Sequence, residues 1–242
     1  MSIYSTLCKE VRSGKKKFAV LIDPDKNDIT SIQKLVKVAI KGGVDYFFLG
    51  GSILINDNQD SLITCLKESC DIPVLLFPGN SMQLNNKADG LLLLSLISGR
   101  NPEMLIGRHV ISAPFLKKSN LEIMPTGYIL VESGSLTTVV YMSNTTPIPS
   151  AKSEVAMCTA MAGEMLGLKL IYMDAGSGAL NPVPGAMIEK VKKNISLPLI
   201  IGGGITTPRK AKDALNAGAD VVVIGNAIEK DPKLIYKIAE IL

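Results

Sequence analysis

The sequence predicts an α/β protein, a single (β/α)8 TIM barrel over residues 1–242. Three observations support this: a length that such barrels reach as one domain, eight short apolar runs, and helical patterns between the runs. The runs are apolar throughout, as strands buried on both faces of a parallel sheet must be. They lie at 18–23, 45–51, 73–79, 90–98, 127–133, 168–174, 197–203 and 220–226.

Helical patterns fill the connections between these runs. Residues 32–40 place apolar side chains three and four positions apart, and the glycine pair that follows is typical of a helix end. A long helix rich in alanine and methionine is expected at 150–166. Two more begin with a capping side chain followed by proline, at Thr207 and Asp231.

One connection is too short for the pattern. Between Gly79, which ends the third run, and Gly90, which starts the fourth, there is no room for a crossover with a full helix. We therefore expect the third helix to be missing or replaced by a loop. The apolar gap in the wall is then covered by a neighbouring subunit, opened as a groove for a long hydrophobic ligand, or simply covered by the loop itself.

Composition excludes several classes of function. The formal net charge of +4 is small and scattered, which argues against a nucleic-acid partner. The longest apolar stretch, 91–98, is too short to span a membrane, and the N-terminus lacks an apolar signal core. The four cysteines have no zinc-type spacing, and the single histidine, His109, cannot build a histidine-based metal site. We expect reduced thiols and a soluble, cytoplasmic chain.

Three strand ends in the second half are rich in glycine, at 172–178, 202–205 and 225–226. Glycine lets the backbone approach a ligand closely, and successive N–H groups can converge on an anion. Barrels of this class hold phosphate after strands seven and eight. None of the three segments contains lysine or arginine, so main-chain amides and a helix terminus would meet the charge. Phosphate binding is favoured over plain tight turns because all three segments lie at strand ends.

A second cluster of polar residues follows the first two strands. Asp23 and Ser52 offer oxygen ligands of the kind that Mg²⁺ prefers, and Mg²⁺ can bridge to substrate phosphate oxygens. Lys26 could add charge for a second anionic group. The alternative is that Asp23 only caps the turn that follows it, which is common before proline. Opposite a phosphate cradle, the cluster suggests two anionic substrates at one barrel mouth.

At these residues the chain resembles the geranylgeranylglyceryl phosphate synthase family, which includes the bacterial heptaprenylglyceryl phosphate synthases. The resemblance covers nearly the whole chain in order. The motifs DPDK at 23–26 and FPGN at 77–80, with the YMDAGSGA segment at 172–179, are more specific than GGGI at 202–205, which many phosphate-binding barrels share.

The resemblance implies a Mg²⁺-dependent prenyltransferase that joins sn-glycerol 1-phosphate to geranylgeranyl diphosphate by an ether bond, in ether phospholipid synthesis. It implies Asp23 and Ser52 as Mg²⁺ ligands, a prenyl groove at the missing helix, and a homo-oligomer, dimer or hexamer. The residues expected to hold glycerol 1-phosphate are Tyr172, Met173, Asp174, Ala175, Gly176, Ser177, Gly178, Gly203, Gly204, Gly225 and Asn226.

The candidate catalytic residues are Asp174 and Tyr172, with Asp174 placed to orient or deprotonate the acceptor hydroxyl. Two positions depart from the family pattern. The family commonly has glutamate where Asp174 stands, and some bacterial members have lysine where this chain has Leu21.

Three other readings remain open at this stage. A phosphosugar isomerase or cyclase would need an acid/base pair across the barrel, with Glu132 as the fifth strand's contribution. A flavin-binding barrel would use the same glycines for the flavin phosphate. A non-enzymatic phospholigand scaffold would need the cradle alone. The length of the prenyl chain depends on the shape of the groove.

Overall fold

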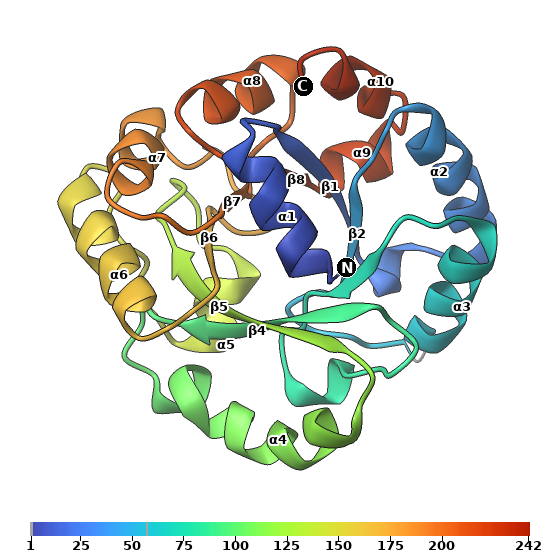
Figure 1. Cartoon of the computed structure of the whole chain (residues 1–242), viewed down its shortest axis with the longest axis horizontal. Coiled ribbons are helices and arrows are strands. Elements are labelled where there is room, and N and C mark those ends of the chain that lie inside the picture. Colours follow the sequence, from blue (N-terminus) through green and yellow to red (C-terminus); the bar gives the residue numbers. More distant parts are fainter. Residues whose placement is uncertain (1, 57) are drawn as a thin grey trace.

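The computed structural model describes residues 2–56 and 58–242, which form one closed barrel of eight parallel strands (Figure 1). The strands follow one another in chain order, and β8 pairs with β1 to close the barrel. Each strand lies within or overlaps its predicted run, so the predicted barrel is confirmed. The strands are β1 (Lys17–Ile22), β2 (Tyr46–Leu49), β3 (Val74–Leu76), β4 (Gly90–Leu96), β5 (Glu122–Leu130), β6 (Leu170–Asp174), β7 (Leu199–Gly202) and β8 (Val221–Ile224).

A ring of helices surrounds the barrel (Figure 1). Thr207 caps one of them as predicted, because its side chain accepts a hydrogen bond from the Lys210 N–H at 3.3 Å. Among the described residues, no helix has the length and apolar content that crossing a bilayer requires. The helices are α2 (Ile29–Lys41), α3 (Gln59–Ser69), α4 (Arg108–Lys118), α5 (Thr138–Ser143), α6 (Ser153–Met165), α7 (Gly185–Lys192), α8 (Pro208–Asn216), α9 (Asn226–Lys230) and α10 (Leu234–Ala239).

The last helix begins later than predicted. Asp231 was expected to cap it directly, but Asp231 and Pro232 form a separate turn in which the Asp231 carboxylate accepts from the Lys233 N–H at 3.0 Å. Helix α10 then starts at Leu234, and the short α9 fills the space between it and β8. The predicted cap is wrong: α10 is preceded by Lys233 without a side-chain cap, and it starts at Leu234 rather than at Pro232.

Alternating residues divide the apolar side chains between two cores. On β2, Tyr46 and Phe48 point into the barrel, whereas Phe47 between them points outward and packs beneath the helices. All three are buried. This period of two explains why the runs are apolar throughout, since each strand is covered on both faces.

A helix that the apolar runs did not reveal, α1 (Ile3–Arg12), packs against the N-terminal end of the barrel and crosses the middle of the view in Figure 1. Its Leu7 is buried in the inner core. Glu122 accepts the first two N–H groups of the helix at 2.6 and 2.9 Å, which satisfies donors that a helix start leaves unpaired. The spacing of Ile3, Leu7 and Val11 is the sequence signal for this helix.

The third outer helix is replaced by a loop, as predicted. Residues 77–89, all of them described, contain one short 3₁₀ turn, η2 (Ser81–Gln83), and no α-helix. The Gln83 side chain fixes this loop, accepting from the Gly79 N–H at 3.0 Å and donating to the Gly51 carbonyl at 2.8 Å. The loop is thereby tied to the ends of β2 and β3.

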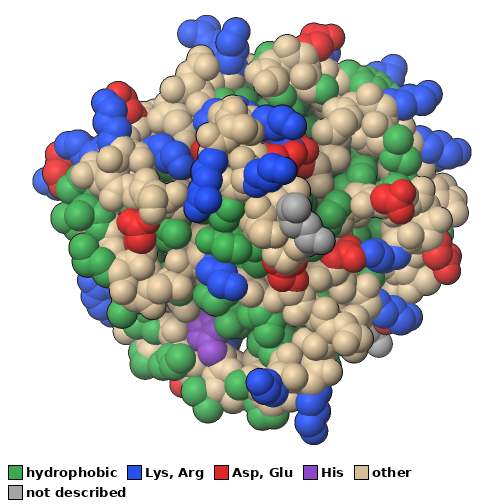
Figure 2. Space-filling model, in the orientation of Figure 1, with side chains coloured by type: hydrophobic (Ala, Val, Ile, Leu, Met, Phe, Trp, Pro, Cys, Tyr) green, Lys and Arg blue, Asp and Glu red, His purple; other side chains and the backbone are tan. Residues whose placement is uncertain are grey.

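The wall of the barrel is less covered at β4 than at β2, β6, β7 and β8. Leu93, Leu94 and Ser95 are partly exposed, whereas β2, β6, β7 and β8 are buried along their whole length. Figure 2 shows hydrophobic side chains and the protein's histidine at the surface between the places of β4 and α4 in Figure 1. Lys and Arg side chains gather instead over the middle of this face, where α1 lies.

Candidate active site

A cavity of about 410 Å³ opens at the carboxyl ends of the strands. It brings together both groups of predicted residues, since Asp23 and Ser52 line it along with Gly204 and Gly225. The two clusters could have lain on opposite ends of the barrel, which would have separated the two reactants. Their common cavity satisfies the geometric condition for one reaction that involves both.

The glycine-rich side of the cavity is shaped by left-handed backbone. Gly203 and Gly204 follow β7 with φ angles of +77° and +69°, a region that side chains rarely adopt. A Cβ on Gly203 would lie 2.5 Å from Asp174 Oδ1 and 2.6 Å from the Gly176 nitrogen. The main chains after β6 and β7 therefore approach each other in a way that only glycine permits, and backbone polar groups line the cavity.

Asp174 ends β6 at the floor of this region and is 7% exposed. Its Oδ2 accepts a 2.5 Å hydrogen bond from the Tyr128 hydroxyl, and its Oδ1 accepts from the Gly176 N–H at 2.8 Å. Burial raises the pKa of Asp174, and the two hydrogen bonds oppose that rise by stabilising the carboxylate. Burial also raises the pKa of Tyr128, so the phenol keeps its proton and acts as the donor.

Aromatic rings form the inner wall next to Asp174. Phe77, at the end of β3, stacks on Tyr172 of β6 with ring centroids 5.0 Å apart. Tyr128 lies 5.6 Å from Tyr172 and 6.1 Å from Phe77. Offset ring contacts of this kind add packing energy beyond the area they bury. The cluster fixes the two hydroxyl-bearing rings and separates the polar cradle from the barrel core.

The predicted cation site lies after β1. Asp23 caps the short 3₁₀ turn η1 (Pro24–Lys26), accepting from the Asp25 N–H at 3.1 Å, so the capping reading of this residue is correct. Its other oxygen, Oδ2, lies 3.0 Å from Lys26 Nζ. A Cβ on Gly51 would be 3.6 Å from Asp23 Oδ1, which puts the carboxylate beside the segment that carries Ser52.

This donor set fits a hard cation that keeps much of its water. Within the described residues 2–56 and 58–242, no group of three or more His, Cys, Asp or Glu side chains could enclose a metal ion. Asp23 and Ser52 offer one carboxylate and one hydroxyl, both oxygen donors, in a cavity with room for ligand oxygens. Mg²⁺ is commonly held by one or two carboxylates together with water and substrate phosphates.

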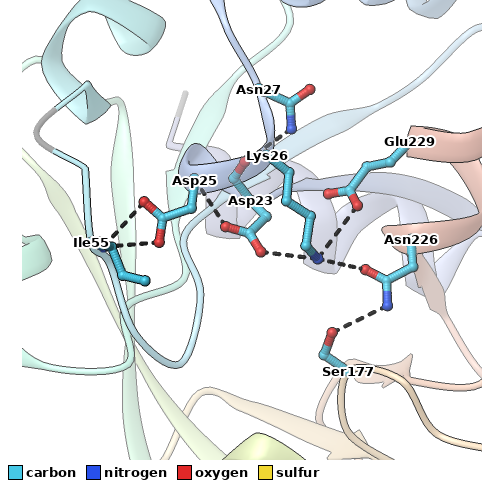
Figure 3. A network of polar contacts seen from close by, with 8 residues as sticks. All are labelled: Asp23, Asp25, Lys26, Asn27, Ile55, Ser177, Asn226 and Glu229. Atoms are coloured by element: carbon cyan, nitrogen blue, oxygen red, sulfur yellow. Dashed lines mark hydrogen bonds and ion pairs between the residues drawn. The ribbon is translucent and has the colours of Figure 1, made fainter.

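Lys26 links the two sides of the site (Figure 3). Its ammonium contacts Asp23 and also lies 3.0 Å from Asn226 Oδ1 and 3.5 Å from Glu229 Oε2. Asn226 in turn donates to the Ser177 hydroxyl at 3.2 Å. A polar chain therefore runs from the predicted cation site to the glycine-rich segments, from elements that β1 and β8 place next to each other.

Away from these polar groups the cavity is largely apolar, although Glu103, Arg108 and His109 also line it. It reaches the thinly covered wall at β4, the loop that replaces the third helix, and one face of α4. Ser112 is the buried small residue of α4 at this wall, and Arg108 of the same helix donates to the Gly79 carbonyl at 2.8 Å. The apolar lining includes Leu84, Leu91, Leu93, Leu94, Leu96, Met104, Val139 and Met142.

Most of the predicted site residues line this cavity, and two of the expected glycerol phosphate contacts do not. Met173 and Ala175 alternate with Tyr172 and Asp174 and point outward, into the core beneath the helices. The prediction treated 172–178 as one binding segment, but the first part of it is still strand, where neighbouring side chains take opposite faces. These two residues support the site from behind.

Two further positions complete the comparison with the sequence. Glu132 is exposed and accepts from the Ser150 N–H and hydroxyl, outside the cavity lining. His109 lies in α4 at the cavity wall, with Nε2 2.9 Å from the Leu94 carbonyl. Sequence reasoning missed Tyr128, whose inward position on β5 at the pairing level of Tyr172 is the signal that could have found it.

The fold and the cavity define a barrel enzyme with its site at the carboxyl ends of the strands. Residues 11–242 match the PcrB family. The chain is 53% identical to the geranylgeranylglyceryl phosphate synthase of Chitinophaga pinensis over 98% of this chain and 94% of that one. Identity to the enzyme of the same name from Methanothermobacter marburgensis is 38%, over 96% and 94% of the two chains.

The structure is similar to that of (S)-3-O-geranylgeranylglyceryl phosphate synthase from Thermoplasma acidophilum, solved in complex with its substrate sn-glycerol-1-phosphate. The TM-score is 0.93 at 30% sequence identity, and the match covers 99% of this chain and 98% of that one. The chain therefore belongs to the PcrB family, and it is a prenyltransferase.

Proposed function

We propose that this enzyme is a Mg²⁺-dependent geranylgeranylglyceryl phosphate synthase, which joins sn-glycerol 1-phosphate to geranylgeranyl diphosphate. The observation that carries the proposal is the single cavity in which a glycine-rich anion cradle, a carboxylate suited to a cation and an apolar wall meet. An ether bond forms between a small polar acceptor and a long apolar donor, and these three features correspond to the parts of the two substrates.

The acceptor half would hold glycerol phosphate through main-chain N–H groups around Gly176, Gly203 and Gly225. A fixed phosphate turns the free hydroxyl toward the donor, and such positioning replaces a bimolecular encounter with a local one. Asp174 lies at the floor of the same region, where it can accept the hydroxyl proton. Its raised pKa makes it a stronger base than an exposed aspartate while the hydrogen bond from Tyr128 keeps it oriented.

The donor half would place the diphosphate near Asp23 and Ser52 and the prenyl chain along the wall at β4. Mg²⁺ held by these two residues would neutralise the charge on the departing diphosphate. Phe77, Tyr128 and Tyr172 line the cavity, and their rings could stabilise positive charge on an allylic carbon. The leucines of β4 shield that carbon from water, which would otherwise compete with the acceptor.

The bond changes then balance as a substitution. The acceptor oxygen forms a bond to C1 of the prenyl chain, the bond from C1 to the diphosphate oxygen breaks, and its electron pair leaves with the diphosphate. The hydroxyl proton passes to Asp174. The products are the prenylglyceryl phosphate ether and inorganic diphosphate.

Incubation with labelled glycerol phosphate, Mg²⁺ and prenyl diphosphates of increasing length tests this proposal. We expect an organic-extractable labelled product that requires Mg²⁺, is strongest with the geranylgeranyl donor, and does not form from sn-glycerol 3-phosphate. If no donor gives extractable product, the proposed function is wrong. If a prenyl diphosphate of another length is the best donor, only the proposed length of the prenyl chain is wrong.

Asp23→Asn separates the two halves of the site. The amide is a far weaker cation ligand, so we expect turnover to fall at least about 100-fold, the scale of losing one electrostatic stabilising group, while binding of glycerol phosphate measured by calorimetry persists. Asp28→Asn is the matched control, because Asp28 is an exposed helix N-cap that asparagine fills equally well. Equal turnover in the two variants would contradict the assigned role of Asp23.

The other readings are less well supported by the geometry. An isomerase pair would need Glu132, which contacts Ser150 at the surface. A flavin-binding barrel predicts a yellow purified protein, so we expect a colourless one. A binding scaffold without turnover predicts that the wild type forms no product and that Asp23→Asn leaves the ligand affinity unchanged. The same assays measure both quantities.

A further inference from the structure

The three glycine-rich segments contain no lysine or arginine, yet a cation lies at their edge. Lys26 comes from the other end of the chain, after β1, and its ammonium contacts Asn226 at the start of α9 at 3.0 Å. The closure of the barrel between β1 and β8 makes this approach possible. Lys26 and Asn226 both line the cavity, and Figure 3 shows their side chains turned toward each other.

The contact determines how the Asn226 amide is oriented. An ammonium group only donates hydrogen bonds, so the amide oxygen must face Lys26 and the NH₂ group must face away from it. On that side the NH₂ group meets the Ser177 hydroxyl at 3.2 Å, within the glycine-rich region. With the amide reversed, the Asn226 NH₂ group would face the Lys26 ammonium, and both are donors. The amide oxygen, an acceptor, would then face the region proposed to hold the phosphate. Lys26 thus keeps the Asn226 donor aimed at the cradle.

Two carboxylates hold the ammonium in place. Asp23 Oδ2 lies 3.0 Å from Nζ and Glu229 Oε2 lies 3.5 Å from it, on opposite sides of the lysine in Figure 3. One cation between two carboxylates leaves excess negative charge beside the cradle. A cation that binds Asp23 weakens the ion pair between Asp23 and Lys26. The ammonium can then interact with Glu229, Asn226 and an incoming anion.

We propose that Lys26 is a phosphate-binding and positioning residue of the acceptor half: it orients the Asn226 amide and offers a phosphate the ammonium donor that the glycine-rich segments lack. This rests on the proposed function to the extent that the cradle binds a phosphate. Lys26, which follows the first strand, would thereby help to bind a phosphate that the segments after the last three strands hold.

Phosphate binding without donor or Mg²⁺ tests this proposal directly. Calorimetric titration with sn-glycerol 1-phosphate and with inorganic phosphate should show that Lys26→Gln weakens both by about tenfold or more, the scale of one hydrogen bond to a charged group. Lys26→Arg keeps the charge and should retain part of the affinity. Lys34→Gln, an exposed substitution on α2 with the same change in net charge, should leave the affinity unchanged.

A double-mutant cycle with Asn226→Ala distinguishes positioning from general support. If Lys26 acts through Asn226, the double variant loses less affinity than the two single losses combined. Asp23→Asn should bind phosphate at least as tightly as the wild type, because it removes a carboxylate that competes for the ammonium. The Lys26 side chain is 47% exposed, so thermal melting of the variants should remain close to that of the wild type.

The outcomes separate this inference from the proposed function. Wild-type protein that binds neither phosphate ligand overturns both. Binding by Lys26→Gln within about twofold of the wild type, or an equal loss in Lys34→Gln, overturns only the role of Lys26. Additive effects in the cycle overturn its action through Asn226.

Discussion

The two halves of the cavity are built in different ways. The half formed by β6, β7 and β8 has fully buried strands and presents main-chain groups in left-handed turns. The half formed by β3 and β4 has a three-residue strand, no helix in the connection between these two strands and a partly exposed wall of leucines. A small anion needs fixed donors at defined positions, whereas a flexible apolar chain needs only surface removed from water.

This difference predicts where the site tolerates change. A side-chain substitution does not exchange a main-chain N–H group for another donor. A side chain added at Gly203 must instead displace Asp174 or the Gly176 nitrogen. The apolar half can be reshaped by exchanging one side chain for another of different size. Substitutions in the first half should therefore abolish binding, while those in the second should change which donor is used.

Gly203→Ala is expected to have the largest effect. Its Cβ would lie 2.5 Å from Asp174 Oδ1 in a backbone conformation that side chains rarely adopt, so the turn must rearrange. Loss of two of the proposed amide contacts to the phosphate would correspond to at least about a 100-fold loss of affinity. Calorimetric titration with glycerol phosphate measures it.

Gly167→Ala is the matched control for this prediction. Gly167 follows α6 outside the cavity lining and also has a left-handed φ, +85°, but among the described residues no atom lies within 4 Å of the position of an added Cβ. It should cost about 1–2 kcal/mol of folding stability from backbone strain and leave the phosphate affinity unchanged. Equal losses of affinity in the two variants would show that the close approach at Gly203 is not what shapes the cradle.

In the apolar half, Ser112→Phe should change donor choice rather than abolish turnover. Ser112 is buried on α4 at the cavity wall, and a ring there removes space from the apolar part of the cavity. Each buried methylene contributes about 0.8 kcal/mol, so loss of room for part of a prenyl unit should shift kcat/KM toward shorter donors by about tenfold.

Ile111→Phe controls for the added ring, because Ile111 is 70% exposed on the same helix and lies outside the cavity lining. It should leave the ratio of kcat/KM between long and short donors unchanged. A uniform decrease for all donors in Ser112→Phe, with the ratio unchanged, would indicate that the prenyl chain follows another path.

The same contrast explains what could be predicted from the sequence. Main-chain recognition leaves a direct trace, because glycine is required where the backbone is left-handed, and Gly203 and Gly204 were found for that reason. The missing helix left a trace in the short segment between Gly79 and Gly90. The depth of the groove could not be predicted from the sequence, since it depends on how Ser112 and the leucines of β4 pack in three dimensions.

Side-chain contacts between neighbouring strands were the least predictable part of the site. The Tyr128 hydroxyl meets Asp174 from a neighbouring strand, and Lys26 meets Asn226 across the whole length of the chain. Such pairs follow from strand register and barrel closure, which motif spacing does not encode. The outward turn of Met173 and Ala175 was missed for a related reason, because the end of β6 could not be located to the residue.

Tyr128→Phe should have the smallest effect on turnover, and a diagnostic one. The variant keeps the ring contact with Tyr172 but removes the hydrogen bond that lowers the pKa of Asp174, so burial then raises this pKa further. If the Asp174 carboxylate is the base, as proposed, the acid limb of the kcat/KM profile should move to higher pH, and activity should approach that of the wild type at alkaline pH. Tyr141→Phe, at a 78% exposed tyrosine on α5, is the control that should leave the profile in place. A loss of activity in Tyr128→Phe that is the same at every pH would show that the phenol aligns the substrate rather than setting the basicity of Asp174.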